Sequence, residues 1–122
     1  MRTPFALLLT LLLAGCNSWS SGYHLNNAYR SYKSGDCDRV MLELSQAERK
    51  SRARPWLQPE MSMLRGQCLE RQKYFVDAAQ TYRFIIARYP TSEYAYRARA
   101  RIETLRANGR LPGGDGHLLP LP

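Results

Sequence analysis

The apolar side chains between Tyr74 and Tyr89 recur at intervals of three and four residues, and this spacing constrains the fold more than any other feature of the chain. The stripe consists of Phe75, Ala78, Ala79, Tyr82, Ile85, Ile86 and Tyr89. Residues at that spacing share one face of an α-helix, and a face this wide is buried against other elements. Pro90 follows directly, and the residue before a proline disfavours the helical region. We therefore predict a core helix over Tyr74–Tyr89.

Four further segments carry the same periodicity, so we expect an all-α fold. Their expected bounds are Leu25 to Lys33, Asp36 or Asp38 to about Lys50, Pro59 to about Arg71, and a last helix, capped by Thr91 or Ser92, that carries Ala95, Ala98, Ile102 and Leu105. Gly35 ends the first of these helices. Pro59 suits a first helical turn, because its missing N–H would have no partner there. Asn108-Gly109 follows a helical run, where glycine commonly ends a helix, and it therefore does not indicate a hairpin.

The first 15 residues have the layout of a secretory signal peptide. Arg2 supplies a short positive end, an apolar run extends from Phe5 to Ala14, and small residues close it. That run is ten residues long, whereas a helix that crosses a bilayer needs about 20. We therefore expect export of the chain and removal of residues 1–15.

The four residues Leu13-Ala14-Gly15-Cys16 resemble the lipobox of bacterial lipoproteins. In that family the cysteine sulfur receives a diacylglycerol, the signal is cut before the cysteine, and the freed amine is acylated, with palmitate for example. The resemblance implies lipidation of Cys16 and anchoring in a lipid bilayer. In that family, an aspartate directly after the cysteine often retains the protein in the inner membrane. This chain has Asn17 at that position, which implies attachment to the outer membrane, facing the periplasm. An ordinary cleaved signal and a cytoplasmic start are the alternatives.

Beyond the signal we expect a lipidated, flexible tether at residues 16–24, a helical domain at residues 25–107, and a disordered tail at residues 108–122. Without Arg2 the remaining chain keeps 17 basic and 10 acidic residues, a net charge of +7. A protein with this charge can bind anionic lipid headgroups, acidic proteins or polyanionic glycans. Alternatively, the charge serves only to keep the protein soluble. No nucleic-acid-binding motif occurs, so nucleic acid is not an expected partner.

Small, apolar and aromatic residues recur at a spacing that suggests an internal repeat. Gly66, Ala78, Tyr82 and Pro90 are separated by 12, 4 and 8 residues. This pattern resembles the tetratricopeptide repeat, which has a small residue on its first helix, an alanine and an aromatic on its second, and a closing proline. An earlier pair fits more loosely, with valine where alanine is usual; its matching residues are Ala28, Val40, Leu44 and Ala47. The resemblance implies two helix pairs plus a capping helix, because stacked pairs bury faces that one pair cannot. A generic five-helix bundle is the alternative.

The segment from Tyr89 to Ala95 also resembles the turn between repeats in tetratricopeptide lipoproteins of bacterial envelopes. That resemblance implies a membrane-anchored protein-interaction adaptor in outer-membrane or cell-envelope assembly, with an unidentified envelope protein or peptide as its partner. Two other functions stay open. One is a binding module for peptidoglycan or another anionic glycan, and the other is a structural accessory of a secretion or pilus complex.

In the tetratricopeptide family the first helix of each pair lines a concave binding surface. Carried over position by position, the resemblance implies a groove lined by Tyr29, Tyr32, Met63, Gln67, Glu70, Tyr94, Arg97 and Arg101. Tyrosine and arginine are enriched at binding hot spots, and such a groove suits an acidic peptide. The alternatives are that these aromatics belong to the core and that the arginines form a solvated face.

Cys37 and Cys68 remain in the mature chain besides Cys16. An even pair in an oxidising compartment favours a disulfide. On the repeat implied above, Cys37 starts the second helix and Cys68 lies late in the third, an adjacent antiparallel helix, so a bridge fits. The alternative is a pair of buried free thiols that pack as small hydrophobes.

Signals for catalysis and metal binding are weak. His24 and His117 fall in the expected tether and tail, where no neighbour would hold them in catalytic geometry. The sequence has no helical His/Glu metal pair, no closely spaced cysteines of a zinc site, and no nucleophile turn or phosphate loop. We therefore expect no enzymatic activity, no metal and no cofactor.

Overall fold

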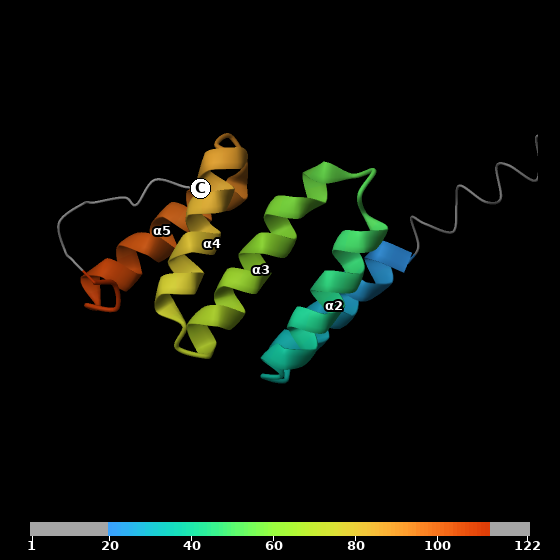
Figure 1. Cartoon of the computed structure of the whole chain (residues 1–122), viewed down its shortest axis with the longest axis horizontal. Helices are drawn as coiled ribbons and strands as arrows, with labels where there is room; N and C mark the ends of the chain where they lie inside the picture. The colour runs from blue at the N-terminus through green and yellow to red at the C-terminus, as the bar shows by residue number, and fades with distance from the viewer. Residues whose placement is uncertain (1–19, 113–122) are drawn as a thin grey trace, which may run out of the picture. The chain divides into compact units, whose positions relative to one another are not determined.

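The computed structural model describes residues 20–112, and within them every regular element is helical (Figure 1). In chain order these are a helix at residues 20–33, α2 (Cys37–Lys50), the short 3-10 helix η1 (Pro55–Leu57), α3 (Gln58–Arg71), α4 (Phe75–Arg88) and α5 (Glu93–Ala107). They form two compact units, the first ending at Pro55 and the second beginning at Trp56. The prediction of an all-α fold is confirmed for this part of the chain. The signal and Cys16 lie outside the described residues.

The first unit is an antiparallel pair formed by the helix at residues 20–33 and α2 (Figure 1). Gly35 turns the chain with a φ of 80°, a left-handed conformation that glycine adopts without steric cost. The Asp36 side chain then accepts a hydrogen bond of 3.0 Å from the backbone N–H of Arg39, so Asp36 rather than Asp38 caps α2. The core of the pair consists of Ala28, Val40, Leu44 and Ala47, each at most 1% exposed.

The first helix includes residues that the sequence assigned to a flexible tether, so that prediction is wrong for residues 20–24. Ser21 is buried and accepts a hydrogen bond from the guanidinium of Arg54. His24 reaches the carboxylate of Glu43 on α2. These polar side chains find partners far along the chain, and composition alone, which is small and polar here, does not show such pairings.

The second unit packs α3 against α4 and α4 against α5, with a smaller contact between α3 and α5. Its buried core consists of Met63, Ala78, Ala79, Tyr82, Ile85, Ala95, Ala98, Ile102 and Leu105. The expected boundaries hold to within about one residue: Pro59 lies in the first turn of α3, and α4 ends before Pro90. Ser92 caps α5 by accepting a hydrogen bond of 3.1 Å from the Ala95 N–H.

Residues 108–112, the described residues that follow α5, form no further helix, yet they stay on the core. Gly109 has a φ of 65°, and the Arg110 N–H donates to the Leu105 carbonyl at 2.8 Å. Leu111 packs against the core cluster, and the Arg110 guanidinium lies 5.1 Å from the centre of the Phe75 ring. The prediction of a disordered tail is therefore wrong for residues 108–112, while residues 113–122 lie outside the described part.

The two helix pairs repeat at a constant offset of 38 residues. The helix at residues 20–33 corresponds to α3 at residues 58–71, and α2 at residues 37–50 corresponds to α4 at residues 75–88. Buried residues coincide under this offset: Ala28 with Gly66, Val40 with Ala78, Leu44 with Tyr82, and Ala47 with Ile85. Each pair also turns on a residue with positive φ, Gly35 in the first and Lys73 in the second. The similarity therefore extends from sequence spacing to backbone conformation.

Gly66 lies where α3 approaches the ring of Tyr82 most closely. A Cβ atom added to Gly66 would lie 2.9 Å from Cζ and 3.0 Å from Cδ1 of that ring. Tyr82 is fully buried, and its hydroxyl donates a hydrogen bond of 2.6 Å to Glu70. The ring is therefore held on both sides and has little freedom to move away from a larger residue at Gly66.

We expect Gly66→Ala to lower the free energy of unfolding by about 1–3 kcal/mol, because overpacking a filled core forces side chains or backbone to shift. Gly22→Ala is the matched control: this exposed helical glycine has no atom within 4 Å of an added Cβ. It should instead gain about 0.5–1 kcal/mol from helix propensity. Urea unfolding followed by circular dichroism measures both changes, and equal stability gains in the two variants would contradict the close contact.

Candidate functional site

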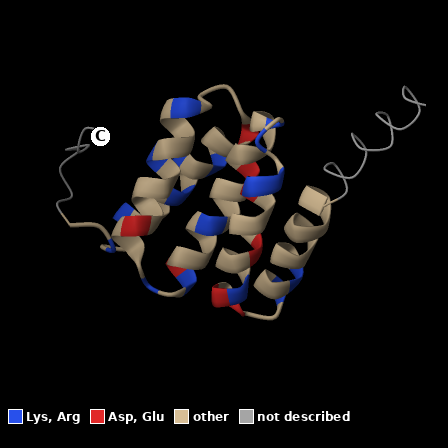
Figure 2. Ribbon diagram, turned by 45° about the vertical axis from the view of Figure 1, so that its right-hand side comes forward, with Lys and Arg blue, Asp and Glu red and all other residues tan. Residues whose placement is uncertain are grey.

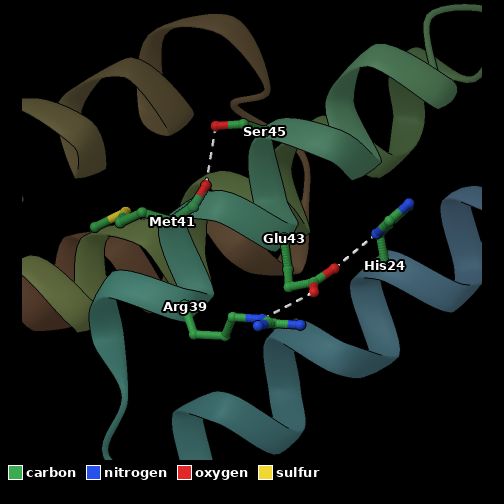
Figure 3. A network of polar contacts seen from close by, with 5 residues as sticks. All are labelled: His24, Arg39, Met41, Glu43 and Ser45. Atoms are coloured by element: carbon green, nitrogen blue, oxygen red, sulfur yellow. Dashed lines mark hydrogen bonds and ion pairs between the residues drawn. The ribbon is translucent and has the colours of Figure 1, made fainter.

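Glu43 is the centre of a polar network in the first unit (Figure 3). Its side chain is 6% exposed, and its two carboxylate oxygens face two different partners. His24 Nδ1, from the helix at residues 20–33, lies 2.6 Å from Oε2. Arg39 Nε, one turn earlier on α2, donates to Oε1 at 3.1 Å. A buried carboxylate is costly unless paired, and here two partners satisfy it.

The pKa of Glu43 lies below its ordinary value of 4.5 because of the hydrogen bond from His24. Burial acts in the opposite direction, and the hydrogen bond from Arg39 adds to the lowering. Glu43 is therefore ionised at neutral pH, and His24 Nδ1–H donates to it. This network ties the first helix to α2 by a hydrogen bond as well as by packing.

Glu70 forms a second network, in which one carboxylate joins all three helices of the second unit. Glu70 lies on α3 and accepts from the Tyr82 hydroxyl on α4 at 2.6 Å. Arg101 on α5 binds it with both ends of its guanidinium: Nε donates to Oε1 at 2.9 Å, and a terminal nitrogen donates to Oε2. Such two-pronged pairing is stronger and more directional than a single hydrogen bond.

The titration of these groups reflects this arrangement. Burial on its own raises the pKa of Glu70, but the hydrogen bonds from Arg101 and Tyr82 outweigh burial and leave the pKa below 4.5. Burial, followed by the hydrogen bond to Glu70, raises the pKa of Tyr82. The hydrogen bond to Glu70 also raises the pKa of Arg101. At neutral pH the network is therefore a carboxylate held by a phenol and a guanidinium.

Two residues of the predicted groove, the half-buried Tyr94 and the exposed Arg97, lie on the first two turns of α5. The Arg97 guanidinium lies 5.4 Å from the centre of the Tyr94 ring, a cation–π distance. A terminal nitrogen of Arg97 lies 3.5 Å from Glu93, and the Arg97 side chain is 57% exposed. Burial raises the pKa of Tyr94, with Glu60 of α3 adding a further upward effect. Arg97 is therefore a solvent-accessible cation next to an aromatic surface.

The structure separates the predicted groove residues into different roles. Met63 is 4% exposed and belongs to the core of the second unit, so its prediction as a groove residue is wrong. It faces inward because α5 packs over that side of α3. Glu70 and Arg101 bind each other. Gln67 on α3 is half-buried, as are two residues on the helix at residues 20–33, Tyr29 and Tyr32.

Cys37 and Cys68 are both buried, with exposures of 6% and 0%. Both are disulfide-bonded, and they are the two cysteines in the described part of the chain. The predicted pairing therefore agrees with the structure, which favours it over two free thiols.

Sequence reasoning missed the network around Glu43 and placed His24 in a tether with no neighbour to hold it. One signal was available. Val40, Leu44 and Ala47 define the buried side of α2, and Glu43 falls beside them at helical spacing. A carboxylate at such a position requires a partner, which points to a cation or a histidine on a facing helix.

Two further searches concern metal ions and membrane spans. Within residues 20–112, no group of three or more His, Cys, Asp or Glu side chains could hold a metal ion. Of the helices in that range, none is both long enough and apolar enough to cross a membrane.

Comparison with known proteins gives no relative: no protein-family model, no curated protein and no solved structure matches this chain.

Glu70→Gln should destabilise the protein by about 1–2 kcal/mol at neutral pH, because it weakens a charged pair whose arginine is partly solvated. The folded-state pKa of Glu70 is lowered, so its contribution is complete above about pH 4.5 and declines as the pH falls through the folded pKa. The difference in free energy of unfolding between wild type and variant should therefore disappear at acidic pH. Unfolding curves from neutral pH to about pH 2 test this, and a difference independent of pH would contradict the pairing.

Reduction of the disulfide should lower the free energy of unfolding by about 3–4 kcal/mol, the loop-entropy value for a closed loop of about 30 residues. The double variant Cys37→Ser/Cys68→Ser should show no response to the reductant. Alkylation of the native protein followed by intact-mass measurement gives the pairing directly, and two modified thiols before reduction would refute the bridge.

Proposed function

We propose that this chain is an envelope lipoprotein built on tetratricopeptide-like helix pairs, and that it acts as a membrane-anchored adaptor for an acidic protein or peptide. The observation that carries the adaptor role is the exposed guanidinium of Arg97 over the half-buried ring of Tyr94 on α5, beside a pairing of Glu70 with Arg101 that fixes α5 against α3. Tyrosine and arginine are among the side chains most enriched at binding hot spots. No catalytic step belongs to this proposal.

The internal repeat supports the tetratricopeptide-like part of the proposal. Two helix pairs share an offset of 38 residues, the same buried positions and the same left-handed turn. In the second pair, the small residue of the repeat pattern, Gly66, lies directly against its aromatic residue, Tyr82. α5 then stands as a capping helix, followed by residues that pack back on the core.

The charge of Arg97 indicates the chemistry of the partner. Arg101 is engaged with Glu70 and is therefore not offered to a partner, whereas Arg97 is 57% exposed with a long contact to Glu93. A partner carboxylate could displace Glu93 and gain a charge-assisted hydrogen bond over the Tyr94 ring. The net charge of the chain without its signal, +7, favours approach of an acidic partner.

The anchor part of the proposal is supported by the sequence alone, since Cys16 precedes the described residues. Leu13-Ala14-Gly15-Cys16 closes a short apolar signal, and Asn17 follows in place of aspartate. Lipidation there would hold the body at the periplasmic side of the outer membrane. Attachment to the membrane confines the search for a partner to two dimensions and raises its effective concentration.

We expect a photo-crosslinking side chain at Thr104, which lies on the Arg97 face of α5, to capture a partner in membranes. The matched position is Arg99, which is also exposed but points to another side of the helix. Adding Arg97→Glu should reduce the Thr104 crosslink by about tenfold or more, the factor that corresponds to 1.4 kcal/mol. Arg101 is unsuitable for this test because its replacement would disrupt the Glu70 pairing.

Mass spectrometry of the crosslinked product identifies the partner. A partner set unchanged by Arg97→Glu would contradict the binding face. Salt-sensitive retention on insoluble cell wall, with no protein crosslink, would favour the glycan-binding alternative. Loss of membrane attachment and of the lipid mass in Cys16→Ser tests the anchor separately.

A further inference from the structure

The turn that follows α2 concentrates positive charge. Arg49 and Lys50 end α2, and Arg52 and Arg54 follow within the next four residues. Between Glu48 and Glu60 the sequence has no acidic residue. Arg49, Lys50 and Arg52 are all exposed. Figure 2 draws the basic positions in blue and the acidic ones in red, and nowhere else in residues 20–112 do four basic residues fall within six consecutive positions.

Within the first unit, this basic turn contacts the N-terminal end of the helix at residues 20–33. The Arg54 guanidinium donates a hydrogen bond to Ser21, in the first turn of the described helix. Ser21 lies five positions after Cys16, and a fully extended chain covers at most about 3.6 Å per residue. The Cα atom of Ser21, which Arg54 contacts, therefore lies within about 18 Å of the Cα atom of Cys16.

A tryptophan follows the same turn in the sequence. Trp56 comes directly after Pro55, begins η1 with it, and is 66% exposed. Exposed tryptophan is unusual in a water-facing loop, whereas at a bilayer surface its amphipathic ring sits at the level of the headgroups. Basic residues next to such a ring are attracted to anionic lipid.

We propose that the basic turn, residues 49–54, contacts the headgroups of an anionic phospholipid bilayer, and that Trp56, two residues further along the chain, reports this contact. This inference rests on the proposed lipid anchor, which would bring the turn to the membrane surface. Charge complementarity, the exposed Trp56 and the short chain from Cys16 to Ser21 all favour lipid over a protein as the occupant. The contact gives the first unit a second attachment, so that it does not swivel freely about the acylated cysteine.

Fluorescence of Trp56 tests the contact in the acylated protein. The chain has two tryptophans, and Trp19→Phe leaves Trp56 as the sole emitter. The protein is reconstituted in phosphatidylcholine vesicles with or without phosphatidylglycerol, each carrying a nitroxide-labelled lipid. We expect quenching of Trp56 with phosphatidylglycerol, and its loss in pure phosphatidylcholine or at about 1 M salt, where the Debye length is about 3 Å.

Charge reversal supplies a matched comparison. Each basic residue near an anionic surface contributes about fivefold to affinity. Lys50→Glu/Arg52→Glu should therefore weaken binding of the mature Cys16→Ser chain to phosphatidylglycerol vesicles by about 30-fold or more, and abolish quenching in the acylated protein. Arg88→Glu/Arg99→Glu makes the same change in net charge at exposed positions on α4 and α5. This control should retain quenching and lose only a few-fold in binding. Equal losses in the two variants would overturn the proposal, because they would show attraction by total charge alone.

Failure of the anchor is distinguishable from failure of this contact. Intact mass reports the acyl groups, whereas binding of the mature Cys16→Ser chain to phosphatidylglycerol vesicles reports the turn without them. If the wild-type protein carries no acyl groups while the Cys16→Ser chain still binds these vesicles through Lys50 and Arg52, the anchor is refuted and the contact is not. An acylated protein with Trp56 unquenched in phosphatidylglycerol vesicles would refute the contact.

Discussion

The approach of the Tyr82 ring to Gly66 is the contact on which the second unit depends. Because Gly66 has no side chain, α3 and α4 come close enough to bury the ring completely. Burial then requires a partner for the phenol, and Glu70 supplies it. Glu70 in turn is a poorly solvated carboxylate that requires a cation, which Arg101 provides from α5. One small residue on α3 thus leads, step by step, to the fixed position of three helices.

The first unit meets the same packing problem with different chemistry. Leu44 occupies the place of Tyr82 and carries no polar group, so Ala28 suffices where the second unit requires glycine. Its buried carboxylate is instead Glu43 on the second helix, paired with His24 and Arg39. Repetition of the backbone therefore does not imply repetition of the polar networks. Each network follows from which buried position happens to carry a polar atom, since that atom must be satisfied locally.

The pairing of Glu70 with Arg101 also bears on the proposed adaptor function, because it leaves Arg97 rather than Arg101 available to the proposed partner. Two arginines one turn apart look equivalent in the sequence. In the structure Arg101 is a fixed part of the helix packing, whereas Arg97 stays exposed over Tyr94. A binding face that combines a rigid support with an exposed cation loses little conformational freedom when it binds. The basic residues of the turn after α2 likewise have two roles: Arg54 donates a hydrogen bond to Ser21, whereas Arg49, Lys50 and Arg52 remain exposed.

The sequence by itself determined four of the helices to within about one residue and the spacing of the repeat, because helical periodicity, Pro59 and Pro90 act through local backbone geometry. It left the caps open between Asp36 and Asp38 and between Thr91 and Ser92. It also indicated the cysteine pair, since an even count favours a disulfide in a chain that is expected to be exported. Tertiary structure alone decided that residues 20–24 are helical, that Met63 is core and that His24 holds Glu43. These outcomes depend on side chains brought together from distant positions, and a buried polar atom takes whichever partner the packing places within hydrogen-bonding distance.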